Sequence, residues 1–158
     1  MNNFKGLIVV IVAVLLLSAC APAAVDTPAP ADVVPGADKV PAECAADRYG
    51  CAKIEPGQTI KIGMGSPMTG GDASFGIDAE QAGKIAVADA EPLYGFSFEL
   101  VAEDDQGAAE GGAAVANKFV ADQTLVGVAG HLFSGATAAA MPIYEAKGIP
   151  MLSPSATN

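Results

Sequence analysis

The sequence predicts an α/β domain built on a parallel sheet with helices on both faces. From Thr59 onward, short apolar stretches alternate with stretches of helical character, in the order strand, helix, strand, helix, strand, helix, strand. No hairpin signal lies between consecutive strands. Strands that are joined through helices pair in parallel, and the crossovers place those helices over the sheet.

Each element follows from its residue pattern. Strands are expected at 59–65, 96–105, 124–130 and 149–152, and helices at 75–91, 108–122 and 135–148. The stretch "TLVGVAG" (124–130) is apolar throughout, which favours a central strand. The first helix has an Ala-rich side that we expect to pack closely on the sheet. In the third helix Pro142 predicts a late start or a kink, and Gly148 predicts the end.

An export signal is expected before the domain. Residues Leu7 to Leu17 form an uninterrupted apolar run after Lys5. Eleven residues rise only about 16 Å as a helix, about half of the hydrocarbon thickness, so a secretory signal is favoured over a membrane span. "LLLSAC" (15–20) resembles the bacterial lipobox, which implies a signal peptide at 1–19 and a lipid on Cys20 that anchors the chain to a membrane. The alternative is an ordinary secretory signal.

Residues 20–58 are expected to form a lipid-anchored tether. The stretch 21–43 is rich in Ala, Pro and Asp and lacks aromatic residues, so it buries little surface. Cys44 and Cys51 remain as an even pair in an exported chain, which predicts a disulfide, with two free thiols as the alternative. No metal site is predicted, because the chain holds a single histidine, His131, and no second cysteine pair.

Composition and motifs exclude several classes of function. The formal net charge of −10 leaves no basic face for nucleic acid. Gly65 and Gly70 have P-loop spacing, but no lysine follows them, so no nucleotide or other cofactor is expected. Ser134 follows His131 by three residues in a predicted loop, which does not make a triad, and no Gly-x-Ser-x-Gly elbow is present. The sequence therefore does not predict an enzyme, and His131 is interpreted as a hydrogen-bonding loop residue.

Three loops rich in small polar residues leave the carboxyl ends of the predicted strands, where ligands of parallel sheets bind. They are 65–75, 130–137 and 153–158, whereas the acidic loop "DDQGAA" (104–109) is less suggestive. Ser134 precedes the third helix, where a hydroxyl and backbone N–H groups hold a carboxylate. Ser153, Ser155 and Thr157 offer carbonyl and hydroxyl acceptors to an ammonium group. Together these groups favour a free amino acid as ligand.

From Thr59 to Asn158 the chain resembles the N-terminal lobe of periplasmic type I solute-binding proteins of the branched-chain amino acid family. The matching stretches are "IKIGMGSPMTGGDASFG", "AVANKFVADQTLVGVAGHLFSGAT" and "YEAKGIPMLSPSATN". The resemblance implies that Ser134 binds the ligand carboxylate, that the Ser155 carbonyl accepts from the ammonium, and that Thr157 contacts both ends. Phe75 stands where the family often has a tyrosine and is expected to line the side-chain pocket.

The resemblance also implies a function and partners. We expect an exported lipoprotein on the outer face of the cell membrane or in the periplasm, which captures leucine, isoleucine or valine for an ABC transporter permease. Residues 59–158 correspond to one lobe, so we expect an incomplete ligand-binding domain that binds weakly by itself. The alternatives are a binder of amides, urea or aromatic acids on the same fold, and a ligand-sensing ectodomain.

Overall fold

The computed structural model describes residues 41–90 and 92–157. The predicted signal peptide, Cys20 and the tether as far as residue 40 lie outside the described residues. The helices are α2 (Ala42–Ala46), α3 (Ala73–Asp89), α4 (Ala109–Phe119) and α5 (Ser134–Glu145). The strands are β1 (Ile60–Ser66), β2 (Phe98–Asp104), β3 (Leu125–Ala129) and β4 (Met151–Leu152).

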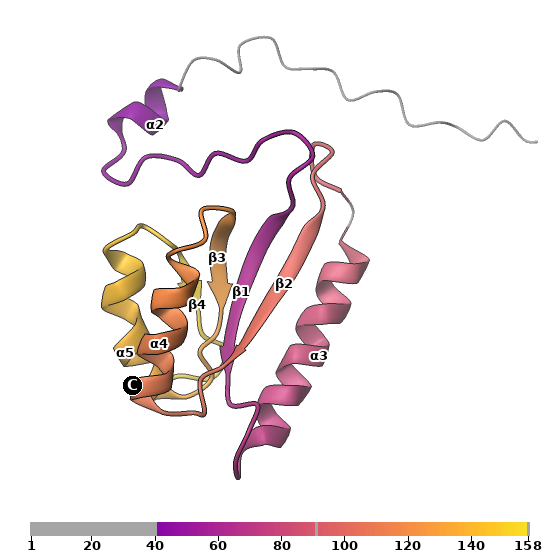
Figure 1. Cartoon of the computed structure of the whole chain (residues 1–158), viewed down its shortest axis with the longest axis vertical. Helices are drawn as coiled ribbons and strands as arrows, with labels where there is room; N and C mark the ends of the chain where they lie inside the picture. The colour runs from indigo at the N-terminus through magenta and orange to yellow at the C-terminus, as the bar shows by residue number, and fades with distance from the viewer. Residues whose placement is uncertain (1–40, 91, 158) are drawn as a thin grey trace, which may run out of the picture. The chain divides into compact units, whose positions relative to one another are not determined.

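The four strands form one parallel sheet in the order β2-β1-β3-β4 (Figure 1). Strand β1 pairs along its whole length with β2, from Ile60 beside Phe98 to Ser66 beside Asp104. On its other side β1 pairs with β3, and β3 pairs with β4. The parallel α/β architecture is therefore confirmed, and β3 occupies the interior position that its apolar sequence predicts.

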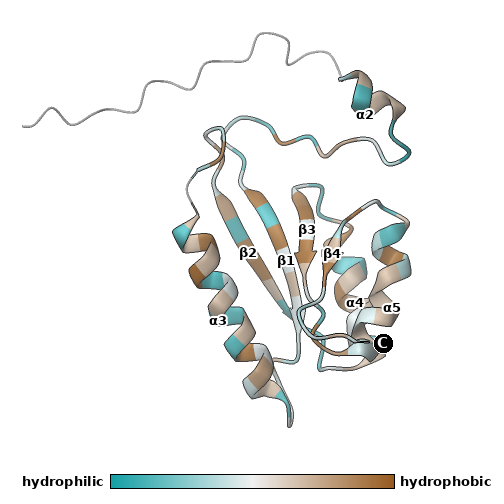
Figure 2. Ribbon diagram, turned by 180° about the vertical axis from the view of Figure 1, so that it is seen from behind, coloured by the Kyte–Doolittle hydropathy of each residue, from teal (hydrophilic) through white to brown (hydrophobic). Residues whose placement is uncertain are grey.

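Adjacent residues of β1 show that helices cover both faces of the sheet. Side chains alternate between the two faces of a strand. A Cβ on Gly63 would meet the ring of Phe119 in α4, whereas the side chain of the next residue, Met64, lies against Gly83 in α3. Helix α3 therefore packs on one face, and α4 and α5 lie on the opposite face (Figures 1 and 2).

The hydrophobic core lies between the sheet and the pair α4 and α5. The helices meet through small side chains, because Ala116, Ala136 and Ala140 are completely buried. Larger side chains fill the space between these helices and the strands. The buried members of this core are Val115, Ala116, Phe119, Leu125, Val128, Ala140 and Tyr144.

Two sequence predictions about the helices are wrong in detail. Helix α3 approaches the sheet through glycines, with Gly76 buried and Gly83 against the sheet, whereas Ile85 is 62% exposed. Glycine allows a closer approach than the alanines on the side that we expected to be buried. Helix α5 begins at Ser134 and runs through Pro142 to Glu145, so the proline does not delay its start, and the alternative of a kink at Pro142 stays a prediction.

The described part of the tether, residues 41–58, carries a short helix and a closed loop. A disulfide joins Cys44 and Cys51, whose Cα atoms are 5.2 Å apart. The loop places Tyr49 directly against Gly148, at the turn between α5 and β4, where the main chain has φ +68°. Across 41–90 and 92–157, no helix combines the length and hydropathy that a membrane span requires.

Candidate functional site

The candidate site lies at the carboxyl end of the sheet, where the loops after β1, β3 and β4 meet. Helix α5 starts directly after the β3 loop, and its first internal bond runs from the Thr137 N–H to the Phe133 carbonyl at 2.9 Å. The N–H groups before Thr137 have no partner within the helix, as at any helix start. The first turn carries no acidic residue. This end of α5 is therefore suited to an anion.

The structure brings Ser134 and Thr157 together. The Thr157 N–H donates to Ser134 Oγ across 3.4 Å, which joins the start of α5 to the loop after β4. Ser155 lies in the same loop, and its hydroxyl donates to the Leu132 carbonyl at 2.5 Å. Three of the residues that the sequence singles out thus gather at the ends of two neighbouring strands.

Phe75 lies across a cavity from Ser155. The cavity has a volume of about 410 Å³ and is bounded by the start of α3 and by the loops after β3 and β4. Its lining includes Phe75, Leu132, Phe133 and Pro154, so most of its surface is apolar. Phe75 is 61% exposed, so much of its ring is open to solvent. Ser134 and Thr157 do not line this cavity, so the structure divides the predicted residues into a polar pair and an apolar pocket.

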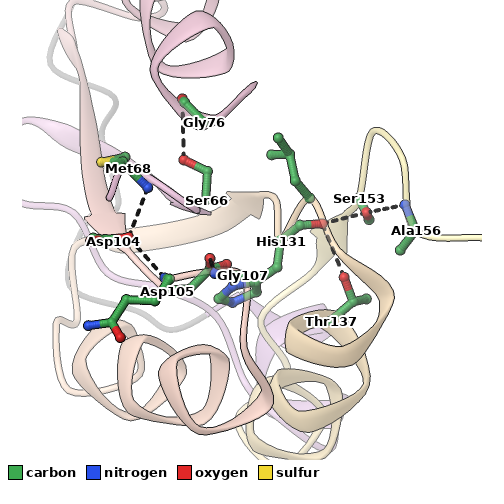
Figure 3. Close-up of polar contacts among 12 residues, drawn as sticks. Ser66, Met68, Gly76, Asp104, Asp105, Gly107, His131, Thr137, Ser153 and Ala156 are labelled. Carbon is green, nitrogen blue, oxygen red and sulfur yellow. Dashed lines mark hydrogen bonds and ion pairs between the residues drawn. The ribbon is translucent and has the colours of Figure 1, made fainter. Parts of the chain in front are cut away.

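Asp104, at the end of β2, organises the loop after β1. Its carboxylate accepts from the Met68 N–H at 2.8 Å (Figure 3), and also from the Thr69 hydroxyl at 2.5 Å and from the Gln106 N–H at 2.9 Å. Burial acts to raise the pKa of Asp104, but these hydrogen bonds outweigh it and hold the pKa below its ordinary value. The carboxylate therefore remains ionised and keeps the loop in place.

The neighbouring residue, Asp105, forms a buried network with His131 and Tyr144. Asp105 Oδ2 lies 2.6 Å from His131 Nδ1, and His131 Nε2 lies 3.1 Å from the Tyr144 hydroxyl. Asp105 and His131 are completely buried, and Tyr144 is 1% exposed. Burial, with a smaller contribution from the charge of Asp105, raises the pKa of Tyr144. Tyr144 is thus a neutral hydrogen-bonding partner.

The acidic loop 104–109 is less suggestive in the sequence than the other loops, yet its aspartates form hydrogen bonds to two of the other three. Asp104 fixes the loop after β1, and Asp105 contacts His131 in the loop after β3. The interpretation of His131 as a hydrogen-bonding loop residue agrees with its two ring contacts. The sequence did contain a signal for this loop, because two acidic residues lie at the carboxyl end of a predicted strand, at the same edge of the sheet as the other loops. Within the described residues, no group of His, Cys, Asp and Glu could hold a metal ion.

Comparison with known proteins identifies the family. The family model described as periplasmic binding protein matches residues 59–158, which is the whole of the sheet and its helices. The chain belongs to the periplasmic binding protein family. This agrees with the resemblance seen in the sequence.

The relatives of this periplasmic binding protein are solute-binding proteins and not enzymes. A Leu/Ile/Val-binding protein homolog of Brucella abortus is 37% identical over 115 residues, which cover 68% of this chain and 31% of that protein. The branched-chain amino acid transporter substrate binding protein LivJ of Streptococcus pneumoniae, in complex with isoleucine, has a TM-score of 0.60 at 33% identity. That match covers 64% of this chain and 30% of LivJ.

A further solved relative is an ABC transporter substrate-binding protein of Desulfitobacterium hafniense in complex with leucine. It has a TM-score of 0.54 at 28% identity and covers 64% of this chain and 30% of that one. The present chain thus spans about a third of the length of the relatives that it matches.

Proposed function

We propose that this chain forms a ligand-binding lobe of a lipid-anchored substrate-binding protein that captures branched-chain amino acids for an ABC transporter permease. The observation that carries the proposal is the contact between Ser134 and Thr157 beside the apolar cavity of Phe75. A polar pair at a helix start suits the charged end of an amino acid, and the adjacent apolar pocket suits an aliphatic side chain. Relatives in complex with isoleucine and with leucine support this ligand class.

Each predicted residue has a role in this proposal. Ser134 Oγ already accepts from Thr157, which leaves its own proton to donate to the ligand carboxylate. The Ser155 hydroxyl is engaged with Leu132, so the backbone carbonyl of Ser155 is the group offered to the ammonium. Phe75 provides an apolar wall for the ligand side chain.

The binding step is tested by NMR titration of the chain with L-leucine, L-isoleucine and L-valine, a method that detects weak as well as tight binding. Ligand is expected to shift the amide signals of Ser134 and of residues 153–157. The Ser134→Ala variant should weaken binding by about tenfold or more, because a charged ligand group then lacks a hydrogen-bond partner. Thr157→Ala should do the same by removing the hydroxyl proposed to contact both ends of the ligand, because alanine keeps the N–H that bonds Ser134. The matched control is Thr59→Ala, because the Thr59 hydroxyl bonds Ser97 at the amino-terminal end of the sheet.

The ligand class is tested in the same titration with benzoate, acetamide and urea. Shifts with one of these compounds and none with the aliphatic amino acids would replace the proposed ligand by an amide, urea or an aromatic acid. Equal binding by the Ser134→Ala and Thr59→Ala variants would remove the proposed carboxylate contact.

The lipid anchor rests on the sequence "LLLSAC" (15–20) and is tested by mass spectrometry of the protein purified from bacterial membranes. The mature chain is expected to begin at Cys20 and to carry acyl chains. The Cys20→Ser variant should be unprocessed or released from the membrane. A mature terminus at another residue refutes the anchor and leaves the ligand proposal intact. The disulfide between Cys44 and Cys51 belongs to the same exported form of the chain.

A further inference from the structure

A path through hydrogen bonds and through the covalent frame of His131 crosses the carboxyl end of the sheet beneath the candidate site. It starts at Asp105 after β2, passes through the imidazole of His131 after β3, and continues from the His131 carbonyl to the Ser153 hydroxyl at 2.5 Å. Ser153 Oγ in turn accepts from the Ala156 N–H at 2.9 Å (Figure 3). This path thus connects a buried carboxylate to the loop that carries Ser155 and Thr157.

The protonation of this network follows from its partners. Asp105 Oδ1 accepts from the Gly107 N–H at 2.8 Å, and Asp105 Oδ2 faces His131 Nδ1. A carboxylate only accepts, so Nδ1 carries the imidazole proton and Nε2 is left as an acceptor for the Tyr144 hydroxyl. Every polar atom of the three side chains then has a partner, which agrees with the absence of unsatisfied buried side-chain atoms among the described residues.

The His131 side chain has no room to move. A Cβ on Gly65 in β1 would overlap the imidazole ring, so the ring lies directly against the β1 backbone. The imidazole of His131 and the ring of Tyr144 are stacked, with their centroids 6.0 Å apart. With both nitrogens bonded and the ring against β1, the imidazole holds one orientation, and the carbonyl of the same residue is held by the Thr137 and Ser153 hydroxyls.

The carbonyls of His131 and Leu132 accept the hydrogen bonds that hold the loop after β4. The His131 carbonyl accepts from Ser153 and also from the Thr137 hydroxyl at 3.0 Å, and the Leu132 carbonyl accepts from Ser155. Burial of a carboxylate, an imidazole and a phenol costs free energy that burial of three apolar side chains would not. A polar network at this place is therefore better explained by what it orients than by stability.

We propose that Asp105, His131 and Tyr144 form a positioning network that sets the geometry of the ligand loop 153–157 through the carbonyls of His131 and Leu132. None of the three touches the ligand in this scheme. The inference rests on the proposed function for its meaning, because the loop that it places is the proposed ligand loop. The coupling of loop 153–157 to the buried imidazole is tested separately from ligand binding.

The first test uses the fact that His131 is the only histidine in the chain. Long-range ¹H–¹⁵N NMR of the chain reports its tautomer without ambiguity. A protonated Nδ1 with a strongly downfield, slowly exchanging proton is expected in the wild type. The Asp105→Asn variant should lose this signal, and Tyr144→Phe should retain it with a shifted Nε2 resonance. A wild-type imidazole that is protonated on Nε2 alone overturns the network.

The second test asks whether the loop follows the network. Both variants should shift the backbone amide signals of residues 153–157 more than those of β1 or β2. The matched controls are Asp122→Asn at the other end of the sheet and Tyr94→Phe on an exposed turn, where Tyr94 is 88% exposed. Unmoved loop signals in both network variants overturn the proposal. Tyr144→Phe loses a single hydroxyl and retains a usable measurement if Asp105→Asn does not fold.

Leucine titration separates this inference from the proposed function. With the loop displaced, affinity for L-leucine is expected to fall by about tenfold in Tyr144→Phe, the loss associated with one broken buried hydrogen bond. Leucine affinity equal to wild type in a variant whose loop signals have moved overturns the positioning role. If the tautomer and the loop signals respond as expected but the chain does not bind leucine, only the ligand assignment is refuted.

Discussion

The contact between α4 and α5 gives a sharp prediction about stability. Gly112 in α4 faces the backbone of α5, and a Cβ built on it would lie 2.5 Å from the Ala136 carbonyl oxygen and 2.7 Å from the Ala136 Cα. Both are backbone atoms, so no side chain can rotate away. Gly135, also in a helix, has no atom within 4 Å of its added Cβ. The substitutions Gly112→Ala and Gly135→Ala are therefore the same chemical change in opposite environments.

The size of the effect follows from these distances. To restore ordinary contact near 3.4 Å, α5 would have to move away from α4 by about 0.9 Å, which forfeits about a quarter to a half of the dispersion energy between the facing atoms. Overpacking of this kind costs about 1–3 kcal/mol, against a gain of about 1 kcal/mol from replacing a helical glycine. Gly112→Ala should thus lose up to about 2 kcal/mol, whereas Gly135→Ala should gain up to about 1 kcal/mol.

Urea unfolding followed by far-ultraviolet circular dichroism measures both variants. A difference of about 2 kcal/mol between them corresponds to roughly 10 °C in melting temperature for a domain of about 100 residues. The reasoning fails if Gly112→Ala is as stable as Gly135→Ala, since the helices could not then be in close backbone contact. An unchanged slope with denaturant would show that the change lies in stability and not in compactness.

Two other predictions concern the amino-terminal end of the sheet. The hydrogen bond from Lys61, followed by bonds from Thr124, lowers the pKa of Asp122 to about 2, so its stabilisation is present above about pH 4 and is lost as the pH falls towards 2. Asp122→Asn should flatten the dependence of the urea midpoint on pH over that interval, and an unchanged dependence would contradict the assignment. Reduction of the disulfide should speed hydrogen exchange in residues 44–53 while α4 and α5 keep their protection, because the bond closes only a local loop. Loss of protection in the helices would show instead that the loop supports the whole lobe.

The strands and helices could be predicted from the sequence, but the buried hydrogen-bond network could not. Apolar runs that alternate with helical stretches predict a parallel sheet, because strands buried on both faces need apolar residues throughout. The four strands begin within two residues of their expected starts. The approach of α3 through Gly83 was missed, because a glycine contributes nothing to an apolar pattern. The partnership of Asp105 with His131 joins residues 26 positions apart, and it depends on strand order, which no local pattern reports.

The hydrogen bonds of the three serine hydroxyls at the site show which of them can donate a proton to a ligand. The Ser155 hydroxyl donates its one proton to Leu132, and the Ser153 hydroxyl donates its own to His131, so neither proton is available to a ligand. Ser134 Oγ receives a proton from the Thr157 N–H and keeps its own. Among these three hydroxyls, only that of Ser134 can donate to a carboxylate without breaking a bond that holds a loop. In the proposed site, two serines therefore hold the loop, and Ser134 offers its proton to the ligand. Ser134→Ala removes that donor together with the acceptor of the Thr157 N–H, so it should weaken binding and shift the Thr157 amide signal.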